Sequence, residues 1–153
     1  MRIFLVRHAH ALDGKDDEVR PLSAKGRKQI RQVAAFFRDN GRLDAREFWH
    51  SPLVRARDTA QGLVRELGQR AKRVEVAGLR PEDKPAVLAK RLNAVRRPVA
   101  VVGHEPHLSA LASLLVAGRP APVLFEFRKC GVICLEKAGR HWVVRWQVAP
   151  GLL

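Results

Sequence analysis

The sequence is poor in cysteine, in aromatic residues and in long apolar runs. It contains two cysteines and no tyrosine, and only 6% of its residues are aromatic. If the segment around Cys130 and Cys134 is a strand, the two side chains lie on one face about 13 Å apart, too far for a disulfide bond. No uncharged apolar stretch approaches the roughly 18 residues of a membrane-spanning helix. These absences exclude a disulfide-rich or membrane-spanning protein and predict two reduced core cysteines.

The N-terminus lacks the apolar segment and small-residue cleavage site of a secretory signal peptide, so we expect a cytoplasmic protein. Acidic residues are scarce, since 15 Asp and Glu against 29 Lys and Arg give a formal net charge of +14. This surplus either attracts phosphorylated or acidic partners or reflects an arginine-rich solvated surface. Nucleic-acid binding is disfavoured, because the chain has no recognisable nucleic-acid motif and few aromatic residues with which to stack bases.

Apolar runs and helical spacings alternate along the chain. Its 153 residues and 46% hydrophobic content fit one domain, residues 1–153. The alternation predicts an α/β fold, a three-layer α/β/α sandwich around a mostly parallel central sheet, with antiparallel strands near the end. The expected strands are 3–6, 47–50, 73–76, 98–103, 124–127, 131–136 and 142–148, and the expected helices are 23–40, 52–67, 84–95 and 105–117.

Two of the apolar runs end in a histidine. Residues 3–6 are followed by Arg7 and His8, and residues 98–103 are followed by His104. In such sheets, ligands bind in the crevice beyond the carboxyl ends of the strands. If the two strands are neighbours, the two histidines therefore share one site.

A third strand-end segment is 51–60, with the sequence SPLVRARDTA. Ser51 is expected to cap a helix and Pro52 to start it, which places Arg55 in the first turn. Arg20 belongs to a further segment, RPLS, which binds phosphate or works as a turn and helix cap.

These residues suit phosphoryl chemistry. A dianionic phosphoryl group needs cations around its three equatorial oxygens, and Arg7, Arg20 and Arg55 can supply them, because a planar guanidinium holds two oxygens at once. His8, partly neutral near pH 7, can attack phosphorus through one ring nitrogen while the other donates to an acceptor. Arg57 is expected to be a solvated charge. A solvent-facing or capping role is expected for the histidines outside these motifs, which are His10, His50, His107 and His141.

Four segments together resemble the motifs of the histidine phosphatase superfamily, which has the phosphoglycerate-mutase-like fold. They are RH at 7–8, RPLS at 20–23, SPxxRAxxTA at 51–60 and GHEP at 103–106. The resemblance implies that His8 is the nucleophile, that His104 helps to hold the transferring phosphoryl group, and that water hydrolyses a phosphohistidine enzyme intermediate. It also implies that no metal or cofactor takes part, and no His and Cys spacing suggests a metal site.

The chain is too short for the lid insertions found in mutases and many small-molecule phosphatases of that superfamily. It resembles instead the compact SixA-type branch, phosphohistidine phosphatases that remove phosphate from histidine on signalling or phosphotransfer proteins. Residues 16–22 and 78–81 support this placement. An open site of this kind admits a phosphorylated side chain on another folded protein, which is the partner that we expect.

A proton donor is less necessary for this reaction than for ester hydrolysis, because the P–N bond to imidazole is labile. The candidates for a general acid are Asp17 first and Glu18 second, since both could lie beside the leaving group, and then Glu105, which follows His104. The other interpretation of these carboxylates is a solvated loop.

Two alternative functions stay open. One is a phosphatase for a small phosphomonoester, and the other is a catalytically weak phosphate-binding interaction module. The binding module is suggested by Ala9, because the family motif usually has glycine at this position. If this position needs a positive φ or a close backbone approach to phosphate, a methyl group costs stability or affinity. The sequence carries no signal for an oligomeric state.

Overall fold

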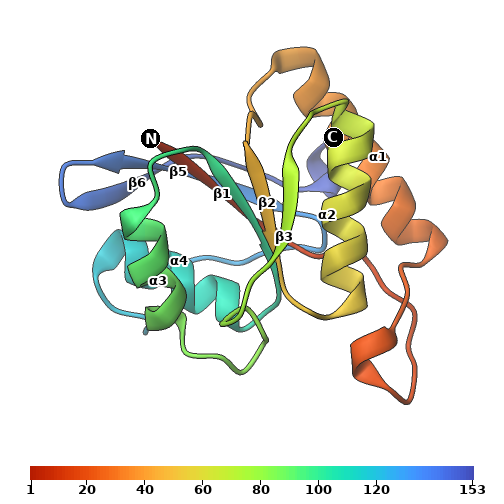
Figure 1. The fold of residues 1–153 in the computed structure, drawn as a ribbon, viewed down its shortest axis with the longest axis horizontal. Helices are drawn as coiled ribbons and strands as arrows, with labels where there is room; N and C mark the ends of the chain where they lie inside the picture. The colour runs from red at the N-terminus through yellow and green to blue at the C-terminus, as the bar shows by residue number, and fades with distance from the viewer.

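The structure, a computed structural model, describes residues 1–153 and consists of a six-stranded sheet with helices on both faces (Figure 1). The strands lie in the order β3-β2-β4-β1-β5-β6. They are β1 (Arg2–Arg7), β2 (Glu47–His50), β3 (Lys72–Glu75), β4 (Val99–Gly103), β5 (Val132–Ala138) and β6 (His141–Val148). The α-helices are α1 (Ala24–Asn40), α2 (Val54–Leu67), α3 (Pro85–Ala94) and α4 (His107–Ala117), and the short 3-10 helices are η1 (Asp17–Val19) and η2 (Pro150–Leu152).

Strand β1 lies between β4 and β5 in the middle of the sheet. It pairs in parallel with β4, where Arg7 lies opposite Gly103, and antiparallel with β5. Strands β2 and β3 continue the parallel part beyond β4, whereas β6 pairs antiparallel with β5. The mostly parallel sheet expected from the sequence is confirmed, and the carboxyl ends of β1 and β4 lie side by side.

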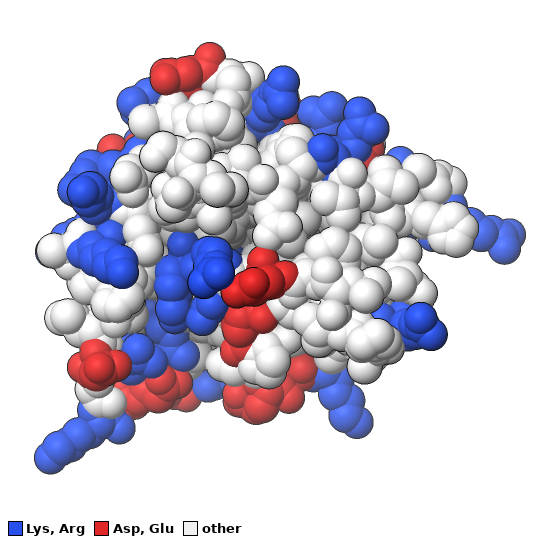
Figure 2. Space-filling view, turned by 180° about the vertical axis from the view of Figure 1, so that it is seen from behind, with Lys and Arg blue, Asp and Glu red and all other residues white.

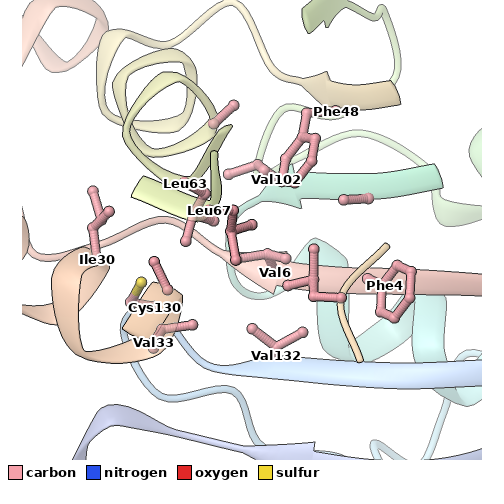
Figure 3. Packing of buried hydrophobic residues seen from close by; sticks show 14 of the residues in the cluster. Phe4, Val6, Ile30, Val33, Phe48, Leu63, Leu67, Val102, Cys130 and Val132 are labelled. Carbon is pink, nitrogen blue, oxygen red and sulfur yellow. The ribbon is translucent and has the colours of Figure 1, made fainter. Parts of the chain in front are cut away.

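Each face of the sheet packs against one pair of helices. Phe4 and Val6 of β1 pack with Leu63 in the apolar cluster beneath α1 and α2 (Figure 3). Ile3 and Leu5 join the cluster beneath α3 and α4 on the opposite face. Because successive strand side chains alternate between faces, burial on both sides requires an unbroken apolar strand. Each such side chain contributes roughly 1.5–3 kcal/mol, which anchors β1 beneath the polar residues that follow it.

Helix α1 begins and ends as its sequence predicts. The Ser23 hydroxyl accepts a hydrogen bond from the Gly26 N–H at 3.0 Å, and Gly41 ends the helix with a left-handed φ of 63°. Gly26 also lets the helix lie directly against the chain that follows β1, because a Cβ there would lie 2.0 Å from the His10 carbonyl oxygen. Helix α1 therefore supports the segment that carries the first histidine motif.

Residues 124–127 were expected to form a strand, and this expectation is wrong. Hydrogen bonds to side chains hold this segment in place, whereas a strand would be held by backbone hydrogen bonds to a neighbouring strand. The Leu124 N–H donates to the Ser113 hydroxyl at 2.9 Å, and Gln147 Nε2 donates to the Glu126 carbonyl at 2.7 Å. Residues with a high propensity for strands do not form one here, because no neighbouring strand pairs with their backbone.

Other element boundaries shift by one or two residues. Helix α4 begins at His107 and not at residue 105, because a proline disfavours the helical conformation of the residue before it. Strand β5 begins at Val132, one residue later than expected. A hairpin joins β5 and β6 between the two strands expected there, and its Gly139 has a φ of 60°.

Both cysteines are buried and unbonded, as expected. Cys130 and Cys134 belong to the same apolar cluster beneath α1 and α2, so they act as small core residues. As to membranes, none of the helices combines the length and the apolar character needed to cross a bilayer.

Basic side chains are spread over the surface. Figure 2 shows Lys and Arg around the rim and in the middle of one face, with acidic side chains in a few clusters between them. Some arginines are paired locally, as where Arg2 and Arg145 both contact Glu136 at 3.3 and 3.1 Å. The charge surplus is thus distributed and is not concentrated in a single stripe on this face.

Substitution of Gly26 by alanine is expected to destabilise the protein by at least about 2 kcal/mol, because the methyl group pushes α1 away from the His10 carbonyl. Urea unfolding of the two proteins measures the difference. Gly151→Ala is the control, since nothing lies within 4 Å of a Cβ added there. Equal stability of Gly26→Ala and wild type would contradict this role for the glycine.

Candidate active site

The two strand-end histidines meet at the carboxyl ends of β1 and β4. The ring centroids of His8 and His104 lie 5.0 Å apart with an interplanar angle of 49°. Both side chains are buried. The pairing of β1 with β4 is therefore what turns two separate sequence motifs into one site.

The tautomer of His8 is fixed by its own backbone neighbourhood. Its Nδ1 lies 2.7 Å from the carbonyl oxygen of Ala9, and because a carbonyl only accepts, Nδ1 carries the proton. Nε2 is left unprotonated, and the donor nearest to its lone pair is the Lys129 ammonium at 3.4 Å. Burial, and then the nearby Lys129 ammonium, lower the pKa of His8 from 6.5 to about 2. His8 is therefore a neutral imidazole with an unprotonated Nε2 across the physiological pH range.

His104 is held by a serine that the sequence analysis assigned differently. Its Nε2 lies 2.5 Å from the Ser51 hydroxyl, which also accepts a hydrogen bond from the Leu53 N–H at 3.2 Å. The expected cap at Ser51 and helix start at Pro52 are therefore wrong, because Leu53 occupies the N-cap position of α2. Ser51 precedes the helix and orients the second histidine. Burial, and then the charge of Arg55, lower the pKa of His104 to about 3.

Arg7 follows β1 into the same end of the sheet. Its Nη1 donates to the Phe127 carbonyl at 2.7 Å, and its buried Nε has no hydrogen-bond partner. Burial lowers the pKa of Arg7, and the nearby Glu105 charge partly offsets this. The guanidinium is anchored at one nitrogen and retains an unused donor.

Arg55 and Arg20 converge on one carboxylate. Arg55 is buried and donates to the Asp17 carbonyl at 2.7 Å and to the Asp17 carboxylate at 3.1 Å. Arg20 donates to the same carboxylate at 3.0 Å. Hydrogen bonds from Arg20 and then Arg55 lower the pKa of Asp17, although burial opposes them. The 3-10 helix η1 is thus bound to α2 through an ionised carboxylate.

The other two candidate acids have different partners. Glu18 accepts from Arg80 at 2.7 Å on the exposed rim. Glu105 accepts from the Ser109 hydroxyl, and its second oxygen is buried without a partner. No hydrogen bond joins Asp17, Glu18 or Glu105 to either histidine.

Lys129 is a site residue that the sequence analysis missed. Its Nζ lies 3.4 Å from Nε2 of His8. Burial, and then the charges of Arg7, Arg20 and Arg55, lower the pKa of Lys129 to about 8. No motif singled it out, because it lies in an irregular segment before β5 whose proximity to β1 only the fold creates.

The backbone around Lys129 is hydrogen-bonded to the segment that carries His8. The Cys130 N–H donates to the His8 carbonyl at 3.2 Å, and the Gly131 N–H donates to the Arg128 carbonyl at 2.8 Å. Cys130 has a φ of 58°, a left-handed conformation that is uncommon outside glycine and clusters at functional sites. This turn holds the backbone of Lys129 beside His8.

Ala9 adopts no strained conformation in place of the motif glycine. Cys130 is the one non-glycine residue with a positive φ, so Ala9 does not have one. Its N–H donates to the Thr59 hydroxyl at 2.9 Å, which anchors it to α2. The methyl group is accommodated in the core, so this position needs no positive φ.

The remaining histidines differ in part from expectation. His10 accompanies the cap of α1, with Nδ1 2.7 Å from the Ser23 hydroxyl, and His141 is exposed. For His50 and His107, the expectation of solvent-facing or capping roles is wrong, since both side chains are buried. Their backbone lies in β2 and at the start of α4, which places the two side chains inside the fold. Arg57 is an exposed charge paired with a neighbouring aspartate at 3.0 Å. No group of three or more His, Cys, Asp or Glu side chains could hold a metal ion.

The chain is similar to known phosphatases in sequence. The model of the histidine phosphatase superfamily (branch 1) matches residues 3–80, just over half of the chain. Phosphohistidine phosphatase SixA of Escherichia coli (strain K12) is 27% identical over 159 residues, which cover 98% of this chain and 94% of SixA.

Solved structures share the fold. The protein histidine phosphatase SixA complexed with tungstate matches with a TM-score of 0.87 at 23% identity, covering 99% of both chains. A mycobacterial glucosyl-3-phosphoglycerate phosphatase complexed with VO3 matches with a TM-score of 0.71 at 17% identity, covering 97% of this chain and 99% of the other. The similarity extends over the whole sheet and both helical layers.

The two buried histidines predict that acid destabilises the unliganded protein. Both pKa values lie below 6.5 in the fold, so unfolding takes up protons, and the free energy of unfolding falls as the pH drops below 6.5. Each histidine contributes up to about 1.4 kcal/mol per pH unit, a limit reached well below pH 6.5. Between pH 7 and pH 5, the free energy of unfolding measured in urea should depend less steeply on pH in His8→Gln, by about 1 kcal/mol per pH unit on average. An unchanged slope would contradict a neutral, buried His8.

Proposed function

Because the chain belongs to the histidine phosphatase superfamily (branch 1), we propose that it is a metal-independent phosphatase that removes the phosphoryl group from phosphohistidine on a partner protein. The resemblance to this superfamily and to its SixA-type branch, which the sequence motifs indicated, is confirmed by the matches above. The observation that supports the chemistry is the hydrogen bond from Nδ1 of His8 to the Ala9 carbonyl, which leaves Nε2 unprotonated.

In the proposed first step, Nε2 of His8 attacks phosphorus. The new N–P bond forms as the bond from phosphorus to the substrate imidazole breaks, and the electron pair of that bond leaves with the imidazole. The product is a phosphohistidine at His8. Water then attacks phosphorus, inorganic phosphate leaves, and the His8 lone pair is restored. The Ala9 carbonyl stabilises the charge that Nδ1–H develops while Nε2 is bonded to phosphorus.

Cations around His8, together with the neutral His104, are proposed to hold the equatorial oxygens of the transferring group. Lys129 lies beside the attacking nitrogen, so in an in-line displacement it faces these oxygens and not the leaving group on the opposite side. Arg7 contributes its unused donor, and His104 lies across the site at a ring separation of 5.0 Å. The phosphoryl group competes with the Asp17 carboxylate for Arg55 and Arg20, since both anions need the same guanidinium donors.

The leaving imidazole is proposed to take its proton from water that enters the open site. Asp17 is a poor donor because its pKa is lowered, and Glu18 is held by Arg80. Glu105 is the one candidate acid that is not paired with an arginine. A labile P–N bond tolerates this arrangement better than an ester bond, whose leaving alkoxide needs a proton more strongly.

A protein substrate is supported by the near-complete overlap with SixA, a phosphohistidine phosphatase, without extra chain for a lid. The 98% coverage of this chain and 94% of SixA leave no large insertion in this chain relative to SixA. Ala9 has no positive φ, so one of the two reasons for considering an inactive binding module does not apply. Two unbonded cysteines agree with the reducing cytoplasm, where we place the protein.

Replacement of His8 by alanine is expected to reduce phosphate release from a histidine-phosphorylated carrier protein by at least about a thousandfold, because the nucleophile is lost. The wild type should retain full activity in EDTA and act faster on the carrier than on p-nitrophenyl phosphate. Thermal melts check that the variant is folded. Turnover by His8→Ala would contradict the mechanism. Loss of wild-type activity in EDTA would contradict metal independence. Turnover of the ester alone would contradict the protein substrate.

Lys129 predicts a pH-dependent affinity for tungstate, which stays a dianion over the range tested. Since the pKa of Lys129 is about 8, the ammonium loses its charge above that pH and wild-type affinity falls. Lys129→Met should bind roughly tenfold more weakly at pH 7 and lack this alkaline loss, because one charge-assisted hydrogen bond is gone. Calorimetric titration measures both effects, and Lys129→Arg should retain affinity to higher pH. Parallel pH curves for all three proteins would remove Lys129 from the phosphate site.

A further inference from the structure

A groove of about 1060 Å³ lies between α1 and the C-terminal part of the chain. One wall is a stripe on α1 at helical spacing, formed by Lys25, Lys28 and Gln32. The opposite wall is the irregular segment 124–129, together with residues around η2. The groove is open to solvent along its length and is far larger than a phosphate group requires.

The groove reaches Lys129, the side chain next to His8. Lys129 lines it, and the Nζ of this lysine lies 3.4 Å from Nε2 of His8. Gln29 also lines it, and its side-chain oxygen accepts a hydrogen bond from the His10 N–H at 2.9 Å. One wall therefore contacts His8 through Lys129, and the other contacts His10 through Gln29. A molecule that reaches His8 through this groove contacts α1 on its way.

The lining of the groove is basic and partly apolar. Arg128 is paired with Glu126 at 3.4 Å, whereas Lys25 and Lys28 are exposed and form no ion pair. Leu124, on the opposite wall, is 53% exposed. Two unpaired ammonium groups facing exposed aliphatic surface match an acidic segment that also carries apolar side chains.

We propose that this groove docks the segment flanking the phosphohistidine of the partner protein, and that this segment is acidic with apolar residues between its carboxylates. The proposal rests on the proposed function, which requires a protein substrate. A phosphate ion at His8 is too small to reach the α1 stripe as well, whereas the chain of a phosphorylated protein is long enough to contact both. The groove thus discriminates among phosphoproteins by the charge beside the phosphohistidine, while the chemistry at His8 is the same for all.

The test is a double charge reversal, Lys25→Glu with Lys28→Glu, in the full-length protein. The control is Lys72→Glu with Lys90→Glu, which changes the net charge equally at exposed positions on β3 and α3. The substrate is a histidine-phosphorylated carrier domain in two forms, with glutamates or with lysines beside the phosphohistidine. Release of phosphate gives kcat/KM for each enzyme variant on each form of the carrier. Turnover of p-nitrophenyl phosphate measures the activity of the site around His8 without docking.

We expect wild type and control to prefer the glutamate form, with the preference weakening as salt is added. The groove variant should lose roughly tenfold in kcat/KM on that form, gain on the lysine form, and keep its activity on the ester. Equal values for groove and control variants, with active wild type, would overturn the docking proposal alone. An equal loss on the ester would do the same. No release from either carrier by wild type would overturn the proposed function as well.

Discussion

The site depends on one hydrogen bond, from Nδ1 of the buried His8 to the carbonyl of Ala9. It sets the tautomer, so the lone pair on Nε2 points into the space shared with His104 and Lys129. The bond keeps this geometry because β1 is hydrogen-bonded on both edges and buried on both faces. A strand at the sheet edge would fray, and the imidazole would then sample orientations that a nucleophile cannot use.

The cationic surroundings of His8 favour a bound anion. Arg7, Arg55 and Lys129 each lose solvation at this end of the sheet, and burial is the first cause that lowers the pKa of Arg7 and Lys129. Asp17 partly offsets this cost by bonding to Arg55. A bound phosphoryl dianion would relieve the same repulsion, so the cost of gathering the cations is recovered when the substrate binds.

Much of this arrangement could be predicted from the sequence, because unbroken apolar runs ending in Arg7, His8 and His104 identify buried parallel strands and their ligand-binding ends. Ser51 was assigned wrongly, because a serine before a proline satisfies the rules of helix capping whether or not a histidine from another strand bonds to it. Lys129 was missed because its contact with His8 joins residues far apart in the chain, through a turn with no sequence signature.

The central claim is that His8 itself becomes phosphorylated during turnover. Rapid mixing with a histidine-phosphorylated carrier, quenching in alkali, and peptide mapping by mass spectrometry would locate the transferred phosphoryl group. The account predicts a transient, acid-labile phosphohistidine at His8 that appears and decays at rates compatible with phosphate release. Phosphate release with no such species, or with the phosphoryl group on another residue, would contradict it.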